Sequence, residues 1–429
     1  MSAQPLHLPP GVTWIDTSQG LAEAIPSWRA AGELAIDTEA DSYYVYRVKV
    51  CLLQLSTRQG DWLIDPLAGL DLAPLAELCA DARLLKVMHA GSNDVGLLKK
   101  THRFAFANVF DTMLAAQVLG LRRPGLAALL LERFGVEQKK AYQTSDWGKR
   151  PLSEGQLHYA AGDTRFLLPL RDQLLAELQA KGRLDEAQEE FERLTSAEQS
   201  ERAFDPDSWQ RAPGALDLEP LAISVLRELY ALRDSIAARR DRSPHRIFRD
   251  DALVAIARAQ PRSRAELGQL GGQIGWQVER DAGDVLAAVE RGLAAGPYVR
   301  ERRRARGIEG EAPLTERERR RFEALREWRR QRAAQRDVEE SRVATTGTLR
   351  ALAREEVLDR ERLAQVAGMS PFRVREYGDE LLALLANGGE GPVRERSSDG
   401  PAAGEAPRGA SRPAPPVAPP RGARDDLPI

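Results

Sequence analysis

The chain has 429 residues, 42% hydrophobic and 29% charged, so it is long enough for roughly two to four domains with ordinary packed cores. Its net charge of -2 excludes a protein that is basic throughout, so any surface for nucleic acid must be local. The longest apolar stretch, around 113–131, is broken by Arg122, Arg123 and Pro124, which excludes a membrane span of about 20 residues there.

The ends and the cysteines indicate the compartment. The N-terminus, MSAQPLHLPP, lacks the basic and apolar segments of a secretory signal. Cys51 and Cys79 each lie in an apolar run, which favours reduced core thiols over a disulfide framework or a zinc site. We therefore expect a cytoplasmic protein that does not bind membranes.

Strand and helix patterns alternate over the first 180 residues. Short apolar runs predict strands at 33–40, 48–56, 61–65, 84–90 and 108–112. Helical periodicity predicts helices at 66–82, 93–100, 112–120 and 124–134. Three strands close together, followed by strands that alternate with helices, predict a mixed α/β sheet flanked by helices.

From about residue 153 the pattern becomes helical, and composition divides the rest of the chain. The α/β domain is expected to span 1–196. Two small all-α domains are expected at 217–296 and 314–386, joined by linkers at 197–216 and 297–313. Residues 387–429 contain few large apolar side chains and are expected to form a disordered tail.

Two carboxylates close the predicted strand ELAIDTEA. Asp37 and Glu39 are separated by one residue, so both side chains point to the same side of a strand. Such a pair suits Mg²⁺ or Mn²⁺, with a solvated turn as the alternative. Another predicted strand leads into HAGSND, where Ser92 or Asn93 is expected to cap a helix whose first turn contains Asp94.

The stretch LHYAAGD (157–163) offers two candidates for handling an attacking water. Ser153 and Gln156 form a capping-box pattern, so a helix is expected to begin near residue 154. At about 100° per residue, Tyr159 and Asp163 then lie about 40° apart, whereas His158 lies about 140° from Asp163. The spacing therefore favours Tyr159 over His158.

DTE (37–39), HAGSND (89–94) and W-x-x-RPL-x-x-x-Q-x-x-YAA-x-D (147–163) together resemble the ribonuclease D family of DEDD exonucleases, over roughly residues 12–190. The resemblance implies a ribonuclease H-like α/β fold and two bound Mg²⁺ or Mn²⁺ ions. It implies that Asp37 bridges both ions, that Glu39 and Asp163 complete the first site, and that Asp94 helps to hold the second. Tyr159 would orient the water that releases a nucleoside 5′-monophosphate.

The helical part also resembles known domains. Residues 226–272 resemble the helicase-and-ribonuclease-D C-terminal (HRDC) domain, and 314–386 resemble a more divergent second copy. Five arginines around the first helices of the first copy predict a phosphate-binding face, with a solvated, salt-bridged helix surface as the alternative: Arg233, Arg239, Arg240, Arg242 and Arg246.

Further residues have both a functional and a structural interpretation. His89, at a strand end, would position backbone or substrate. Lys140, Trp147 and Arg150 would contact the substrate through charge and stacking, or anchor their loop. For Asp111 and Thr112 we favour a helix-capping role.

The resemblance implies a 3′–5′ exoribonuclease that trims tRNA precursors and other structured RNA 3′ ends, and we expect it to act as a monomer. One alternative is a DNA-directed 3′–5′ exonuclease in repair or proofreading, because the same metal site cleaves either polymer. Another is a non-catalytic RNA-binding adaptor. That alternative would require the loss of a carboxylate, and all four are present.

Overall fold

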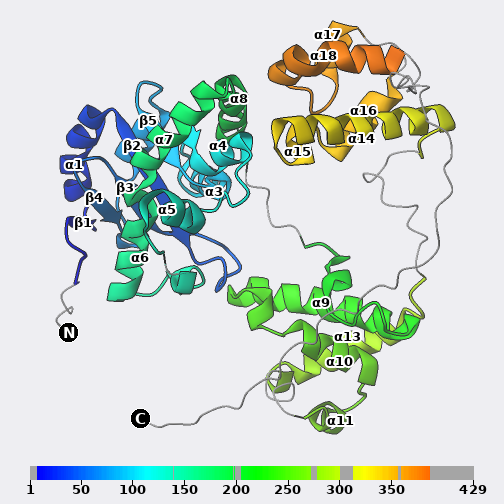
Figure 1. The fold of residues 1–429 in the computed structure, drawn as a ribbon. Helices are drawn as coiled ribbons and strands as arrows, with labels where there is room; N and C mark the ends of the chain where they lie inside the picture. Colours follow the sequence, from blue (N-terminus) through cyan, green and yellow to red (C-terminus); the bar gives the residue numbers. More distant parts are fainter. Residues whose placement is uncertain are drawn as a thin grey trace, which may run out of the picture.

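A computed structural model describes residues 7–138, 140–196, 198, 204–271, 278–299, 313–355 and 359–386. In this part of the chain an α/β domain is followed by two helical domains, here called the first and the second helical domain (Figure 1). The predicted tail at 387–429 lies outside the described residues. None of the helices in the described ranges is long and apolar enough to cross a membrane.

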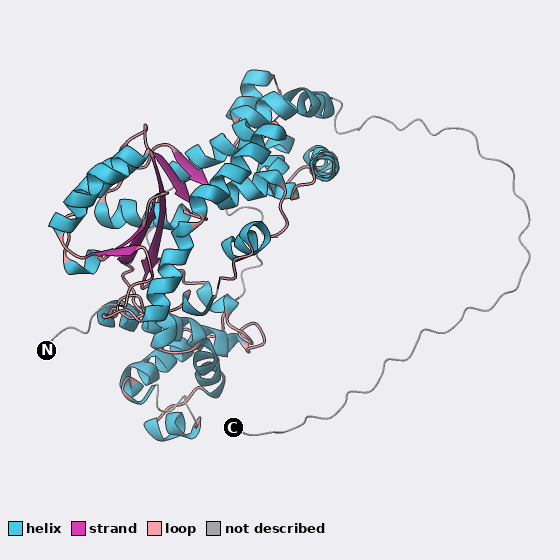
Figure 2. Cartoon of the chain, turned by 60° about the vertical axis from the view of Figure 1, so that its left-hand side comes forward, coloured by secondary structure: helices cyan, strands magenta, loops and turns pink. Residues whose placement is uncertain are grey.

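The α/β domain is built on a mixed sheet with the strand order β1-β4-β3-β2-β5-β6. Strand β2 pairs antiparallel with β3 and parallel with β5, so it lies in the interior of the sheet. Helices cover both faces (Figure 2). The strands are β1 Val12–Ile15, β2 Glu33–Ala40, β3 Val50–Ser56, β4 Asp61–Ile64, β5 Leu85–Met88 and β6 Val109–Asp111.

The predicted mixed sheet is confirmed, and every predicted strand is present. Strand β1, four residues at the edge of the sheet, was not predicted. The fully buried β3 separates two layers of core. Leu53 and Leu55 pack with the layer that contains α1 and α2, whereas Cys51 and Leu52 pack beneath α6.

The helices of this domain follow the predicted order, with two differences. The helix predicted at 66–82 is divided, because Gly69 adopts a left-handed φ of 81° after a short 3₁₀ turn. Neither Ser92 nor Asn93 caps α3, since Gly91 holds the N-cap position. The helical elements are α1 Ser18–Ala31, η1 Pro66–Ala68, α2 Ala73–Ala80, α3 Ser92–His102, α4 Thr112–Leu119, α5 Leu126–Phe134, η2 Lys140–Tyr142, α6 Glu154–Arg165, α7 Leu167–Ala180 and α8 Leu184–Thr195.

The first helical domain packs around the long helix α9. Its elements are η3 Ser208–Arg211, α9 Pro220–Arg240, η4 Pro244–Arg246, α10 Asp250–Ala259, α11 Arg264–Gln269 and α13 Ala282–Ala294. Trp209, Ala212 and Ala215 belong to its core. The second half of the predicted 197–216 linker is therefore part of this domain. The polar composition of the segment predicted a linker, although the segment contains a buried tryptophan.

The second helical domain begins at a capping box formed by Thr315 and Glu318. Leu325, Leu349 and Leu381 are fully buried at its centre. Its helices are α14 Glu316–Arg336, α15 Glu340–Val343, α16 Thr346–Arg354, α17 Arg360–Gln365 and α18 Pro371–Ala386.

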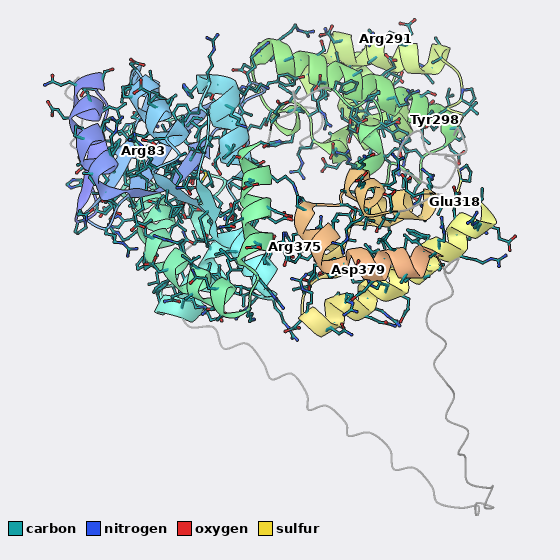
Figure 3. All side chains as sticks on the ribbon, turned by 90° about the horizontal axis from the view of Figure 1, so that it is seen from above. Arg83, Arg291, Tyr298, Glu318, Arg375 and Asp379 are labelled. Carbon is teal, nitrogen blue, oxygen red and sulfur yellow. The ribbon has the colours of Figure 1, made fainter. Side chains whose placement is uncertain are left out.

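An acidic face of α8 holds the second helical domain against the α/β domain. Asp185 accepts from Arg375 at 2.9 Å, and Figure 3 shows Arg375 at this boundary. Glu186 accepts from Arg336, and the two side chains are only 8% and 14% exposed. The domain is therefore attached mainly through charged hydrogen bonds, which salt weakens less when they are buried.

The first helical domain instead holds the loop between β2 and β3, residues 41–49, here called the β2–β3 loop (Figure 1). The Tyr46 hydroxyl donates to Asp234 at 3.0 Å, and the Arg47 backbone N–H donates to Asp241 at 2.8 Å. The Ser243 hydroxyl donates to the Tyr43 carbonyl at 2.9 Å. The strand that carries Asp37 and Glu39 thus continues directly into an interdomain contact.

Candidate active site

Three carboxylates meet at the end of β2 and on α6. Oxygen atoms of Asp37, Glu39 and Asp163 all lie within 4.8 Å of one another. Asp37 and Glu39 approach because alternate residues of a strand point to the same side, as the sequence predicts. Asp163 arrives from a helix that packs against β2, β3 and β4. A strand and a helix far apart in the sequence thus bring three hard oxygen ligands together.

Helix α6 begins at Glu154, where the predicted capping box is present. Ser153 accepts from the Gln156 N–H at 3.3 Å, and Gln156 accepts from the Ser153 N–H at 3.0 Å. Tyr159 and Asp163 line a cavity of about 550 Å³ together with Asp37 and Glu39. The exposed His158 does not line this cavity, and its Nδ1 lies 3.0 Å from the Glu154 carbonyl oxygen.

The fourth carboxylate, Asp94, lies beside this group. It is in the first turn of α3, as predicted, and accepts a hydrogen bond from the Thr38 hydroxyl. Its charge raises the pKa values of Asp37 and Glu39, which places it close to both. Its oxygens are not among those that lie within 4.8 Å of one another. Thr38, between the two acids of β2, therefore links Asp94 to the cluster.

Burial and mutual repulsion oppose the charged forms of these acids. Desolvation is the largest cause in each case, and it raises the pKa of Glu39 to about 9, that of Asp163 to about 7 and that of Asp94 to about 6. Desolvation and the three neighbouring carboxylates also hold the pKa of Asp37 well above its usual range. Divalent cations offset this repulsion, and carboxylate oxygens are the ligands that Mg²⁺ and Mn²⁺ prefer, so the residues fit such ions.

Without divalent cations, the free energy of unfolding is expected to fall as the pH rises from about 4 to about 9. Unfolded carboxyl groups have pKa values near 4, whereas folding raises that of Glu39 to about 9. An acid with a raised folded-state pKa holds its proton more tightly in the folded chain, so stability is lost across this window. Thermal unfolding in EDTA at several pH values measures the fall, and Mg²⁺ should reverse it.

Two variants control this pH series. Asp37→Asn removes one of the converging charges and should make the fall shallower. Glu132→Gln removes an exposed acid of α5 and should behave as wild type. An unfolding temperature in EDTA that changes equally in all three proteins would contradict the repulsion between the buried carboxylates.

His89 lines the same cavity as the carboxylates. Its Nδ1 lies 2.9 Å from the Thr112 hydroxyl, and burial lowers its pKa to about 4, so the ring is neutral near pH 7. Asp111 caps α4 by accepting from the Leu114 N–H at 2.9 Å, which confirms the capping role predicted for this segment. The side chain of Lys140 lies outside the described part of the structure.

Trp147 and Arg150 make contacts within the protein that fit the alternative of anchoring their loop, and substrate contact by either residue stays a prediction. Trp147 is fully buried and packs against the Tyr159 ring with centroids 6.1 Å apart. Arg150 donates to both carboxylate oxygens of Asp65 at 2.7 Å and to the Cys51 carbonyl at 2.6 Å. Its donors are thus occupied by the protein, and the pair fixes the loop before α6 to β3.

Arg150→Gln is expected to lower the free energy of unfolding by on the order of 3 kcal/mol, because it leaves the carboxylate of Asp65 buried without its cation. RNA affinity should stay within about twofold once the protein is folded. Urea unfolding and fluorescence anisotropy with labelled RNA separate the two effects. Asp65→Asn should lower stability in the same way, and a variant that loses affinity at unchanged stability would favour the substrate-contact interpretation.

Several cavity residues were not singled out from the sequence. Gln138 donates to Asp163, Gln143 hydrogen-bonds Tyr159, and the exposed Arg123 lines the opening. Gln54 lies directly opposite Asp37 on β3, is fully buried, and its amide has no hydrogen-bond partner among the described residues. Only Gln54 carries a signal, since it is a polar residue within the apolar strand VCLLQLS.

Comparison with known proteins agrees with this arrangement. A 3′-5′ exonuclease domain model matches residues 12–179, and an HRDC domain model matches 223–289 and 318–385. The chain is 32% identical over 282 residues to ribonuclease D of Pseudomonas paraeruginosa, covering 65% of this chain and 73% of that protein.

Solved structures give the same result. The crystal structure of Escherichia coli RNase D aligns with a TM-score of 0.58 at 26% identity, over 88% of this chain and 99% of that chain. The catalytic core of RRP6 from Trypanosoma brucei aligns with a TM-score of 0.63 at 28% identity, over 68% and 82%. With both domain models matched and most of a curated relative covered, the chain belongs to the ribonuclease D family and is a 3′–5′ exoribonuclease.

Proposed function

We propose that this exoribonuclease trims the 3′ ends of structured RNAs, tRNA precursors among them, as a cytoplasmic monomer that uses two Mg²⁺ or Mn²⁺ ions. The observation that carries the proposal is the approach of Asp37, Glu39 and Asp163 to within 4.8 Å beside Tyr159. The Escherichia coli relative is described as an exoribonuclease involved in structured RNA processing, which supports the substrate class.

The carboxylates act as ligands, and Tyr159 positions the attacking water through hydrogen bonding. Asp37, Glu39 and Asp163 would hold the ions, with Asp94 beside them. Bound ions would lower the pKa of the attacking water and stabilise the leaving 3′-oxygen. Burial, followed by the charges of the nearby acids, raises the pKa of Tyr159 above its usual value, so the phenol stays protonated near pH 7. It therefore suits hydrogen bonding to a water better than proton abstraction.

The catalytic cavity is also lined by groups that attract anions, at and just before the start of α5. Gly125 caps α5, and Ala127 and Ala128 in its first turn line the cavity. The exposed guanidinium of Arg123 lies at the same place. Backbone N–H groups at a helix start favour anions, so these residues suit the substrate phosphate, while the carboxylates of the same cavity would hold the cations.

The test is digestion of 5′-end-labelled RNA stems with and without a 3′ overhang, in Mg²⁺, Mn²⁺ or EDTA. Stepwise shortening from the 3′ end, release of nucleoside 5′-monophosphates and loss of both in EDTA are expected. Matched DNA strands provide the comparison, and equal rates on DNA would favour the DNA-directed alternative. Metal-independent cleavage would overturn the role of the carboxylates as ligands.

A further inference from the structure

The first helical domain contains a cavity of about 680 Å³ lined by four arginines, here called the arginine cavity. Arg240 ends α9, Arg242 follows it and Arg246 lies in η4, while Arg280 lies just before α13. The turn after α9 brings these segments together, because Asp241 there adopts a left-handed φ of 47°. Basic side chains from separate segments thus converge on one space.

The charges around the arginine cavity do not cancel. Arg240 forms an ion pair with the buried Asp281, with Nη1 2.9 Å from a carboxylate oxygen, and this pair forms one wall. Arg242, Arg246 and Arg280 are exposed and form no ion pair within the described ranges. Glu279 is the other acid that lines the cavity. Three guanidinium groups against one carboxylate leave an excess of about two positive charges.

The lack of an ion pair within the described residues distinguishes Arg242 and Arg246 from the other arginines of the predicted phosphate-binding face. Arg233 donates to Asp250 at 2.6 Å, and Arg239 lies 3.8 Å from Asp284. With Arg240 also paired, three of the five predicted arginines match the alternative of a salt-bridged surface. Arg242 and Arg246 do not, and the structure adds Arg280 to them, although Arg280 is 34 or more residues away in the sequence.

An aromatic contact from the α/β domain orients Arg246. Its guanidinium carbon lies 4.0 Å from the centroid of the Tyr44 ring and 5.8 Å from that of Tyr43. Tyr43 in turn lies against His245, with centroids 4.4 Å apart. A guanidinium held by its flat face keeps its N–H donors at the edge free for an anion that accepts two hydrogen bonds, such as a phosphate. The arginine cavity is therefore partly organised before any ligand binds.

Tyr44 also connects the arginine cavity to the catalytic domain. It lines a second cavity, of about 720 Å³, which includes Tyr142 and Lys149. The Tyr44 hydroxyl donates to the Thr144 carbonyl at 2.9 Å, and the Tyr142 ring lies 6.1 Å from that of Tyr159. This second cavity therefore lies between Tyr44, which contacts Arg246, and Tyr142, which contacts Tyr159.

We propose that Arg242, Arg246 and Arg280 bind backbone phosphates of the RNA strand upstream of the 3′ end that occupies the catalytic cavity. The ligand class is the phosphodiester of a single strand, because arginine edges recognise phosphate in pairs and the aromatic side chains of the second cavity suit unstacked bases. The inference rests on the proposed function, since it takes the 3′ end to be bound beside Asp37 and Tyr159.

The test compares two triple variants in the full-length Asp37→Asn protein, which should bind RNA without degrading it. One variant carries Arg242→Gln, Arg246→Gln and Arg280→Gln. The matched control carries Arg258→Gln, Arg262→Gln and Arg264→Gln, which removes the same charge from exposed positions of the same domain that do not line the arginine cavity. Anisotropy with a long single-stranded RNA is measured across a range of salt concentrations.

The cavity variant is expected to bind the long RNA about tenfold or more weakly and to reduce the slope of log affinity against log salt by about 2, since each phosphate contact on a single strand contributes about 0.7. The control variant should retain most of both. Equal losses in the two variants, or wild-type binding by the cavity variant, would overturn the proposal. Inorganic phosphate that displaces the RNA from the starting protein but not from the cavity variant would reassign the cavity to a free anion.

Activity separates this inference from the proposed function. With Asp37 restored, the cavity variant should hydrolyse a dinucleotide at the wild-type rate and show a raised KM only for long RNA. If both substrates are cleaved with wild-type kinetics, the inference fails while the proposed function stands. If wild-type protein releases no nucleotide from RNA, the proposed function fails, and the salt dependence of binding still tests the arginine cavity.

Discussion

Asp37→Asn is expected to lower kcat for nucleotide release by roughly a thousandfold or more, the scale seen when a preorganised electrostatic group is removed from an active site. The charges of Asp94, Asp163 and Glu39 all raise the pKa of Asp37, in addition to its burial. An amide of the same shape offers one neutral oxygen in place of a shared anionic ligand. Release of labelled mononucleotide in Mg²⁺ or Mn²⁺ measures the loss.

RNA binding should survive the same substitution within a few-fold, because Asp37 repels a phosphate unless cations lie between them. Asp16→Asn provides the control, since it makes the same chemical change at an exposed position. The Mg²⁺-dependent rise in unfolding temperature should also shrink in Asp37→Asn but not in Asp16→Asn. Undiminished nucleotide release by Asp37→Asn, purified free of other nucleases, would disprove the role of Asp37 as a ligand.

Tyr159→Phe is expected to lower kcat by about a hundredfold or more, in line with the contribution of a positioned proton-handling group, and to change KM little. The ring stays in place because it packs between Tyr142 and Trp147, with centroids 6.1 Å from each. Only the hydroxyl is lost, together with its hydrogen bonds to Asp163 and Gln143. Single-turnover cleavage of a short RNA measures this step directly.

His158→Ala is the matched comparison, one residue away on the same helix. His158 is exposed and lies outside the catalytic cavity, so its removal should change kcat by less than about twofold. The Mg²⁺-dependent rise in unfolding temperature should remain in Tyr159→Phe, which separates water positioning from displacement of Asp163. A large loss in His158→Ala with an active Tyr159→Phe would exchange the roles of the two residues.

The parts of the site that the sequence predicts are those governed by local geometry. The two-residue period of a strand places Asp37 and Glu39 together, and the capping box at Ser153 fixes the start of α6 and hence the face shared by Tyr159 and Asp163. The mixed sheet is predicted from short apolar runs, which can be recognised in the sequence without knowing which strands pair. For these features, a few neighbouring residues carry all the necessary information.

The two interpretations of Trp147 and Arg150 differ in contacts between distant segments, which the sequence does not reveal. Arg150 pairs with Asp65, which is 85 residues away, and Trp147 is buried beneath α6, contacts that fit the loop-anchoring interpretation. From the sequence, a tryptophan and an arginine beside an active-site motif suit stacking and phosphate contact equally well. The hydrogen bond from the Gln138 amide to Asp163 likewise depends on the path of the segment before α6, which the sequence does not reveal.

The hydrogen bonds between the first helical domain and the β2–β3 loop affect how the activity of a truncated protein should be interpreted. A fragment that stops at residue 196 would keep all four carboxylates, yet Tyr46 and Arg47 would lose Asp234 and Asp241. The loop would gain conformational freedom next to Glu39, and Tyr43, already 48% exposed, would lose its contact with His245. Reduced activity of such a fragment would report a loosened end of the catalytic strand as well as missing RNA contacts.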